Sequence, residues 1–153
     1  MAESEARMKI YTPPAMKEPA NSLWASAHLP DASGPELRHL MMEGLEVSVI
    51  DNIRSIVGFK REEFLATLGL SGRSIARRKE KLSPAQSESI TRYVTAFDMA
   101  LALFGNDFQK TIAWMNKPAK VLGGETPNQA IGTETGARDV VSLIEGIKHG
   151  VVM

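Results

Sequence analysis

Apolar residues recur at three- and four-residue intervals from Glu36 onward, which is the spacing of one face of an α-helix. The clearest stretch begins at Ser83 and ends at Gly105. Ser83 suits an N-cap, Pro84 suits the first helical position, and Gln86 completes a capping box with Ser83. The inward face of this stretch holds Ile90, Val94, Phe97, Leu101 and Phe104. The pattern therefore predicts a central helix of about 20 residues.

Shorter helices are predicted on both sides of this central helix. Apolar faces occur within 37–41, 45–57, 61–68, 72–79, 108–115 and 137–147, and no stretch alternates with the period of a β-strand. We expect Asn106 to cap the helix at 108–115, and Thr133 or Thr135 to begin the last helix, which ends at Gly150. The predicted fold class is all-α.

Residues 1–35 differ from the rest of the chain. They hold five of the eight prolines and sustain no helical or alternating apolar pattern. We expect a partly extended or mobile N-terminal arm, in which Leu23 and Trp24 could dock on the folded body. The remaining chain is expected to divide at the end of the central helix into a first domain, 36–105, and a second domain, 106–153.

Composition narrows the possible chemistry. The chain has 153 residues and no cysteine, which excludes disulfides, thiolate metal sites and a cysteine nucleophile. No apolar run approaches the roughly 20 residues of a membrane span, and the acidic start indicates a cytoplasmic rather than a secreted protein. The three histidines lie far apart in sequence, and no Ser/His/Asp set or carboxylate pair is recognisable. We therefore expect no metal, no cofactor and no enzymatic activity.

The chain has 18 basic and 18 acidic residues, so its net charge is zero, but the two kinds of residue are unevenly distributed along the sequence. The window 60–92 holds eight basic residues against four acidic ones. Such a basic patch in a neutral protein indicates a face that meets an anion, although a solvated helical surface would give the same pattern.

The stretch 61–81 has the layout of a helix-turn-helix. Gly69 falls at the turn, and Ile75 falls where the second helix would pack against the first. The second helix carries side chains suited to guanine edges or phosphates, so the DNA-binding candidates are Ser71, Arg73, Ser74, Arg77, Arg78 and Lys79. Two ordinary core helices with a solvated basic face remain the alternative.

An ordered series of motifs resembles the Xre/MbcA/ParS-like antitoxins. The series starts with the block Arg73-Ser74-Ile75 and Arg77-Arg78, and continues through Leu82-Ser83-Pro84, Phe104-Gly105, Trp114, Pro118, Leu122-Gly123-Gly124 and Thr126-Pro127 to the Gly150-Val151 tail. It covers about 45–152. Ser74 stands where that family often has Thr, and the first 40 residues lie outside the shared pattern.

The resemblance implies an antitoxin of a type II toxin–antitoxin pair. Its helix-turn-helix (Xre/Cro-like) part would bind the operator of its own operon as a homodimer, within a higher toxin–antitoxin complex. Its C-terminal part would block a RES-domain toxin, of a kind that resembles ADP-ribosyltransferases and consumes or uses NAD. The toxin-binding candidates are Trp114, Gly123, Gly124, Glu125, Thr126, Arg138, Lys148, Val151, Val152 and Met153. A stand-alone transcriptional regulator without a toxin, and an interaction module that no longer binds DNA, are the competing readings.

Overall fold

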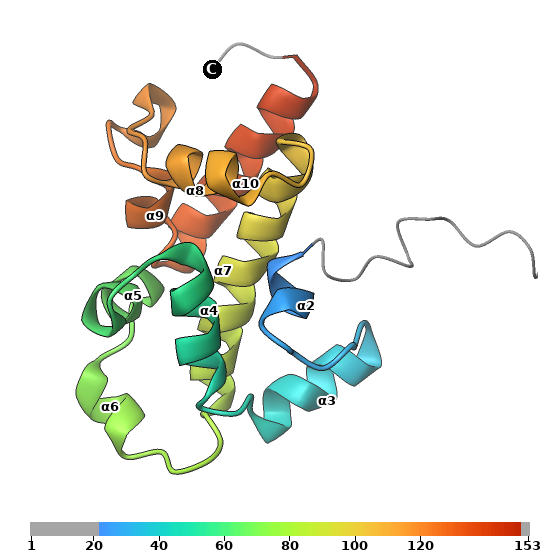
Figure 1. Ribbon diagram of the computed structural model, residues 1–153, viewed down its shortest axis with the longest axis vertical. Helices are drawn as coiled ribbons and strands as arrows, with labels where there is room; N and C mark the ends of the chain where they lie inside the picture. Colours follow the sequence, from blue (N-terminus) through green and yellow to red (C-terminus); the bar gives the residue numbers. More distant parts are fainter. Residues whose placement is uncertain (1–21, 151–153) are drawn as a thin grey trace, which may run out of the picture.

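The computed structural model describes residues 22–150, and this part of the chain is built from helices without strands, which confirms the predicted all-α fold. The helices are α2 (Leu23–Ser26), α3 (Pro35–Glu43), α4 (Val49–Val57), α5 (Arg61–Leu68), α6 (Gly72–Ala76), α7 (Pro84–Leu103), α8 (Phe108–Met115), the 3-10 turn η3 (Lys120–Leu122), α9 (Pro127–Ala130) and α10 (Glu134–Lys148). Figure 1 shows α7 at the centre, with the other helices arranged around it.

Helix α7 is the central helix that the sequence predicts. Ser83 Oγ accepts a hydrogen bond from the Gln86 backbone N–H (3.1 Å), and Gln86 Oε1 accepts one from the Ser83 N–H (2.9 Å). Ile90, Val94 and Phe97 on its inward face are fully buried. Burial of each such side chain stabilises the fold by roughly 1.5–3 kcal/mol, so α7 anchors elements from both halves of the chain.

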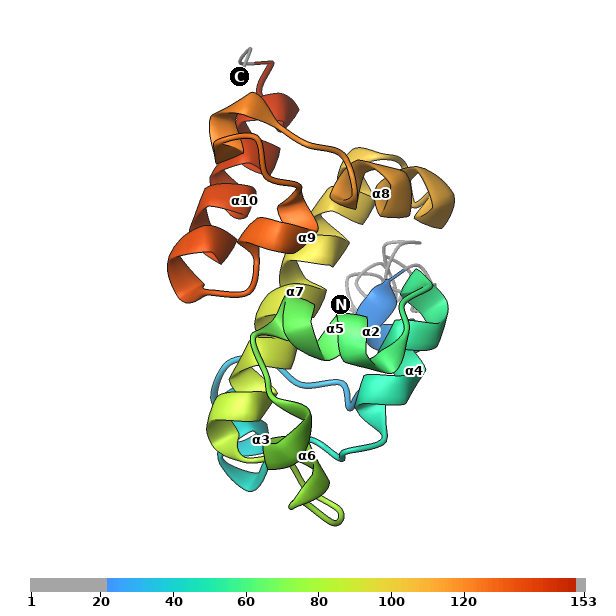
Figure 2. The ribbon, with the colours of Figure 1, turned by 90° about the vertical axis from the view of Figure 1, so that its left-hand side faces the viewer.

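Helices α4, α5 and α6 lie around the N-terminal half of α7 (Figure 2). The ring of Phe64 on α5 meets the ring of Tyr93 on α7 edge-on, with centroids 5.3 Å apart, and Phe59 stacks on Phe64 at 5.8 Å. Edge-to-face pairs add about 0.5–1.5 kcal/mol beyond the buried area. Ile75 is 1% exposed and attaches the short α6 to the same core.

Helices α8, α9 and α10 pack on the C-terminal half of α7. Ala137, Val140 and Ile144 of α10 are buried in the shared core. Thr133 Oγ1 accepts a hydrogen bond from the Gly136 backbone N–H (3.0 Å), so Thr133, and not Thr135, begins the last helix. A Cβ on Gly136 would overlap the carbonyl of Ala130, which explains the glycine in the first turn of α10.

A chain of hydrogen bonds, buried at Tyr93 and Asn128, joins the two halves. The hydroxyl of Tyr93 on α7 donates to Asn128 Oδ1 (3.2 Å), and Asn128 Nδ2 donates to Asn116 Oδ1 (2.9 Å). Burial raises the pKa of Tyr93, so the hydroxyl stays protonated and acts as the donor. The chain thus ties α7 to α9 and to the end of α8.

Residues 22–35 differ from the expected extended arm, because they include a short helix held against the body. Leu23 is fully buried, and the Asp98 carboxylate of α7 accepts hydrogen bonds from the backbone N–H groups of Leu23 (2.6 Å) and Trp24 (3.3 Å). Burial raises the pKa of Asp98, while these two hydrogen bonds act in the opposite direction. Asn52 on α4 donates to the Ala27 carbonyl (3.2 Å). Residues 1–21 of the expected arm lie outside the described residues.

Three predicted boundaries are wrong by a few residues. Helix α4 begins at Val49 and not at Leu45. The Leu45 N–H instead donates to Ser87 Oγ (2.8 Å), and the neighbouring Glu46 forms an isolated β-bridge with Lys81, shortly before α7 begins. Helix α6 ends at Ala76 and not near residue 79, because the chain must turn before Ser83 starts α7. Asp107 caps α8, because its own backbone is extended (φ −92°) whereas Asn106 has a φ of 67°.

Candidate nucleic-acid and toxin interfaces

Gly69 sets the turn between α5 and α6. Its φ of 74° lies in the left-handed region, and the following Leu70 N–H donates to the Leu65 carbonyl (2.9 Å). A Cβ at this position would lie 2.6 Å from the carbonyl oxygen of Gly132, in the connection between α9 and α10. Glycine therefore serves both the turn and its close contact with the C-terminal half of the chain. The result is the two-helix geometry of a helix-turn-helix.

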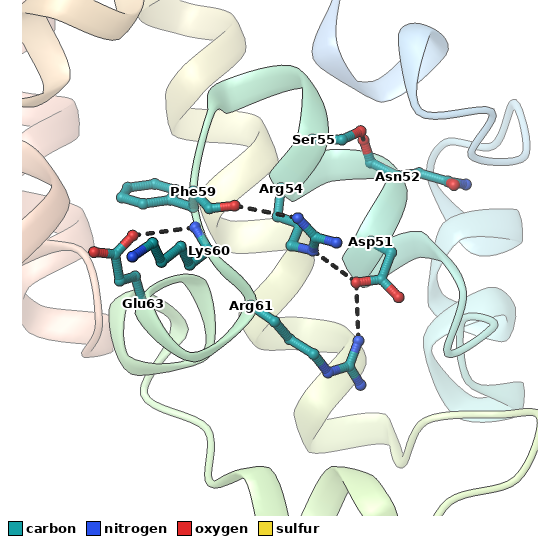
Figure 3. A network of polar contacts seen from close by, with 8 residues as sticks. All are labelled: Asp51, Asn52, Arg54, Ser55, Phe59, Lys60, Arg61 and Glu63. Atoms are coloured by element: carbon teal, nitrogen blue, oxygen red, sulfur yellow. Dashed lines mark hydrogen bonds and ion pairs between the residues drawn. The ribbon is translucent and has the colours of Figure 1, made fainter.

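A polar network fixes α4 against the start of α5 (Figure 3). Asp51 Oδ1 accepts hydrogen bonds from Arg54 Nε (2.7 Å) and Arg61 Nη1 (2.9 Å), and Glu63 Oε1 accepts one from the Lys60 backbone N–H (3.1 Å). The hydrogen bond from Arg54, supported by Arg61, holds the pKa of Asp51 below its ordinary value. Because the Asp51 side chain is 52% exposed, the network orients the helices more than it stabilises them.

Three of the predicted DNA-binding residues present unpaired basic side chains. Arg73, Arg77 and Lys79 are exposed, and their side chains make no ion pair or hydrogen bond with residues 22–150. Arg73 and Arg77 are one helical turn apart and therefore lie on the same side of α6. Arg78 is also exposed, but its Nε donates to the Lys81 carbonyl (3.0 Å), which holds its guanidinium against the loop. A cationic surface of this kind can meet phosphates and guanine edges.

The two predicted serines also make hydrogen bonds within the protein. Ser71 Oγ caps α6 by accepting from the Ser74 N–H (3.1 Å). Ser74 is only partly exposed, and its hydroxyl donates to the Ser71 carbonyl (3.0 Å) and accepts from Gln86 Nε2 (3.3 Å). Gln86, which the sequence assigned only to a capping box, therefore also connects α7 to α6.

The toxin-binding candidates are spread over several elements of the C-terminal half. Trp114 on α8 is partly buried, with its ring 6.0 Å from that of Phe104. Gly123 and Gly124 are exposed and have φ values of 71° and 87°, which form the tight turn after η3. Glu125 is exposed beside them.

The other described toxin-binding candidates lie at the start of α9 and on α10. Thr126 caps α9, where its Oγ1 accepts from the Gln129 N–H (3.0 Å). Arg138 pairs with Glu134 (3.0 Å) and lines a groove against α7, whereas Lys148 is exposed at the other end of α10. Val151, Val152 and Met153 lie outside the described residues. Among the described candidates, Arg138 and Lys148 lie near opposite ends of α10.

Helices α5 and α6, joined by a glycine turn and followed by exposed arginines at and just after the second helix, have the layout of a helix-turn-helix unit. Comparison with known proteins gives the family. The family model described as the antitoxin Xre-like helix-turn-helix domain matches residues 36–94, and that of the antitoxin Xre/MbcA/ParS C-terminal toxin-binding domain matches residues 99–150. The two matches meet within α7.

Curated relatives cover almost the whole chain. One named antitoxin Xre, from Photorhabdus laumondii subsp. laumondii, is 38% identical over 148 residues, which are 95% of this chain and 99% of the relative. Another antitoxin Xre, from Yersinia enterocolitica, is 39% identical over 148 residues, 94% of this chain and 99% of the relative. The chain belongs to the Xre family of antitoxins. It is an antitoxin with a helix-turn-helix unit for DNA and a C-terminal domain for a toxin, and it is not an enzyme.

Among residues 22–150, no cluster of three or more His, Cys, Asp or Glu side chains could hold a metal ion. In the same part of the chain, no helix is long and apolar enough to cross a membrane.

Proposed function

We propose that this antitoxin blocks a RES-domain toxin that consumes NAD, and represses its own operon by binding the operator as a homodimer in the cytoplasm. The observation that carries the proposal is that the basic residues around α6 and the toxin-binding match lie in different parts of the chain. The exposed Arg73 lies on α6 and the exposed Arg77 at its C-cap, in the part that matches the DNA-binding model, while the toxin-binding match starts only at residue 99. The two activities should therefore be separable by substitution.

DNA binding is assigned to Arg73 and Arg77, with Arg78 and Lys79 beside them. Arg73 and Arg77 share one side of a helix that Ile75 holds in place, so their guanidinium groups extend from a fixed base. An arginine that binds guanine with two hydrogen bonds contributes about 1–3 kcal/mol of discrimination against the wrong base. Contacts to phosphate instead make the affinity depend on salt.

The DNA experiment compares Arg77→Ala with Lys110→Ala, an exposed lysine of α8 that serves as a control for the loss of one positive charge. Affinity for the upstream operator and for random DNA is measured at matched salt. Arg77→Ala should lose about 1–3 kcal/mol on the operator, and Lys110→Ala should behave as the wild type. Equal affinity of the wild type and an Arg73→Ala/Arg77→Ala/Arg78→Ala variant for the operator would rule out α6 as the DNA-binding element.

Toxin binding is assigned to the segment after α7. The turn at Gly123 and Gly124 projects with Glu125 exposed, and no residue from 106 to 150 belongs to the basic window 60–92. A cleft that binds NAD can be blocked by steric cover together with a few polar contacts. The turn at 123–126 and the tail from Lys148 to Met153 are the proposed contact elements.

The toxin experiment uses co-expression with the toxin gene adjacent to the antitoxin gene. Growth and cellular NAD should fall with the toxin alone and recover with the full-length antitoxin. Removal of residues 150–153 should weaken this rescue while helix content and operator binding stay unchanged. Rescue of growth without any change in NAD would disprove the NAD-consuming part of the proposal, and full protection by the shortened chain would exclude the tail from the blocking surface.

A further inference from the structure

A surface groove runs between the C-terminal ends of α7 and α10, and we call it the α7–α10 groove. Its volume is about 410 Å³. It is lined by seven residues, of which five are apolar: Met99, Ala102, Leu103, Ile144, Glu145, Ile147 and Lys148. Ile144 is 2% exposed, whereas Ala102 and Ile147 are exposed. The groove therefore has an apolar floor and an apolar rim.

Ile147 gives the rim a large apolar side chain that the rest of the described chain leaves uncovered. It is 38% exposed, and within residues 22–150 only Met42 and Val121 are other exposed large hydrophobic residues. Met99 is partly exposed on the opposite wall, and a methionine side chain adapts to the shape of an apolar partner. An apolar groove with exposed rim residues is typical of a surface that receives part of another protein.

The charges beside the α7–α10 groove suit a protein partner. Lys148 is exposed, and its side chain makes no ion pair or hydrogen bond with residues 22–150. Glu145 Oε1 lies 3.5 Å from His149 Nε2. DNA requires an excess of cations, which one lysine and one glutamate in the lining do not supply. A free lysine at the edge of an apolar groove instead complements a carboxylate next to an apolar segment.

We propose that the α7–α10 groove is the docking site for the toxin and receives an apolar segment of it, with a neighbouring toxin carboxylate paired to Lys148. The inference deepens the proposed function and rests on it. Every lining residue lies within residues 99–150, the part that matches the toxin-binding domain. The groove lined by Arg138, in contrast, extends to Glu88 and Arg92, which precede that match. The α7–α10 groove also ends at Lys148, where the tail proposed above as a contact element begins.

The position of the α7–α10 groove keeps it apart from the DNA-binding surface. Helix α6 lies beside the N-terminal end of α7, and the groove lies at the other end (Figures 1 and 2). Helix α7 has 20 residues, which at 1.5 Å per residue span about 30 Å. Substitutions in the groove should therefore leave operator binding unchanged.

The test is the affinity of the purified full-length antitoxin for the toxin encoded by the adjacent gene, compared between Ala102→Arg and Ala113→Arg. Both alanines are exposed, lie on helices and fall within the toxin-binding match, but only Ala102 lines the groove. Arginine at position 102 fills the groove, so Ala102→Arg should lose about tenfold or more in toxin affinity. Ala113→Arg should bind the toxin as the wild type does, and both variants should keep the operator affinity and melting temperature of the wild type.

A pair of substitutions at Ile147 tests the apolar contact itself. Ile147→Asp places a charge on the rim and should also lose about tenfold or more in toxin affinity. Ile147→Leu keeps an apolar side chain of the same volume and should retain most of the affinity. If circular dichroism shows that Ala102→Arg is unfolded, this pair decides the proposal.

Several results would overturn the assignment of the groove. These are unchanged toxin affinity of Ala102→Arg and Ile147→Asp, an equal loss in Ala113→Arg, and an equal loss in Ile147→Leu. A changed mass in solution of Ala102→Arg with unchanged toxin affinity would assign the groove to a contact between copies of the chain instead. A wild type that binds no toxin would contradict both the groove and the proposed function. Toxin binding that depends on the groove, without any effect of the toxin on cellular NAD, would contradict only the NAD-consuming part of the proposed function.

Discussion

Replacement of Tyr93 by phenylalanine removes a single oxygen atom from the contact between the two halves of the protein. The ring would keep its packing, with centroids 5.3 Å from Phe64 and 6.2 Å from Phe97. The hydroxyl donates to Asn128 Oδ1 at 3.2 Å, and Asn128 is only 6% exposed. The substitution therefore leaves a buried amide oxygen without its donor.

The expected loss of stability follows from that unpaired oxygen. A buried polar group without a partner costs about 1–3 kcal/mol, which is a large part of the 5–15 kcal/mol that stabilises a typical domain. With an m-value of about 1–3 kcal/mol per molar urea, the urea midpoint should fall by about 1 M. Urea unfolding followed by far-UV circular dichroism measures this shift.

A double-mutant cycle separates the hydrogen bond from packing. Asn128→Leu alone should destabilise the protein, since it leaves the Tyr93 hydroxyl buried without an acceptor. Tyr93→Phe combined with Asn128→Leu should lose less than the sum of the two single losses, because neither side then keeps an unpaired group. If Tyr93→Phe unfolds within about 0.3 kcal/mol of the wild type and the cycle shows no coupling, the polar chain does not join the halves and apolar contacts alone do so.

Three further substitutions test other contacts. Asp98→Ala removes the acceptor of two N–H groups at the start of α2 and should destabilise the fold by about 1–3 kcal/mol. Proteolysis around residue 23 should then be faster, and unchanged proteolysis would show that α2 is held in place without Asp98. Asp51 has a lowered pKa in the folded protein. Its contribution to the free energy of unfolding is therefore present above the ordinary pKa of 3.8 and is lost as the pH falls through the lower, folded value. Asp51→Asn should reduce the acid-induced loss of stability below about pH 4, and a pH profile of unfolding identical to that of the wild type would refute this. Gly69→Ala should lower the free energy of unfolding by more than about 1 kcal/mol, because the backbone has a φ of 74° and the new Cβ would meet the Gly132 carbonyl. A melting temperature equal to that of the wild type would contradict the close contact.

The elements with strong local rules could be predicted from the sequence. Ser83, Pro84 and Gln86 determine where α7 starts, and the apolar spacing determines its inward face. Gly69 needs a left-handed backbone, so the turn between α5 and α6 follows from a single residue. These features depend on neighbours within a few positions along the chain, where periodicity and capping preferences act.

Contacts between distant residues could not be predicted in the same way. Asp98 accepts a hydrogen bond from the backbone N–H of Leu23, which is 75 residues away along the chain. The sequence gives no indication of this partner. The hydroxyl of Ser74 likewise bonds to Gln86, 12 residues away, so a side chain that seemed available for DNA is held within the protein. In both cases the three-dimensional packing decides the role, and the residue type alone does not.

The central claim is that one chain uses α6 for DNA and the segment after α7 for the toxin. The most direct test is a single culture that expresses the toxin, the Arg73→Ala/Arg77→Ala antitoxin and a reporter driven by the antitoxin's own operator. The account predicts that growth is rescued as by the wild type while repression of the reporter is lost. Two results would contradict the account. One is the loss of both growth rescue and repression in a variant that keeps its helix content, and the other is repression that survives the double substitution.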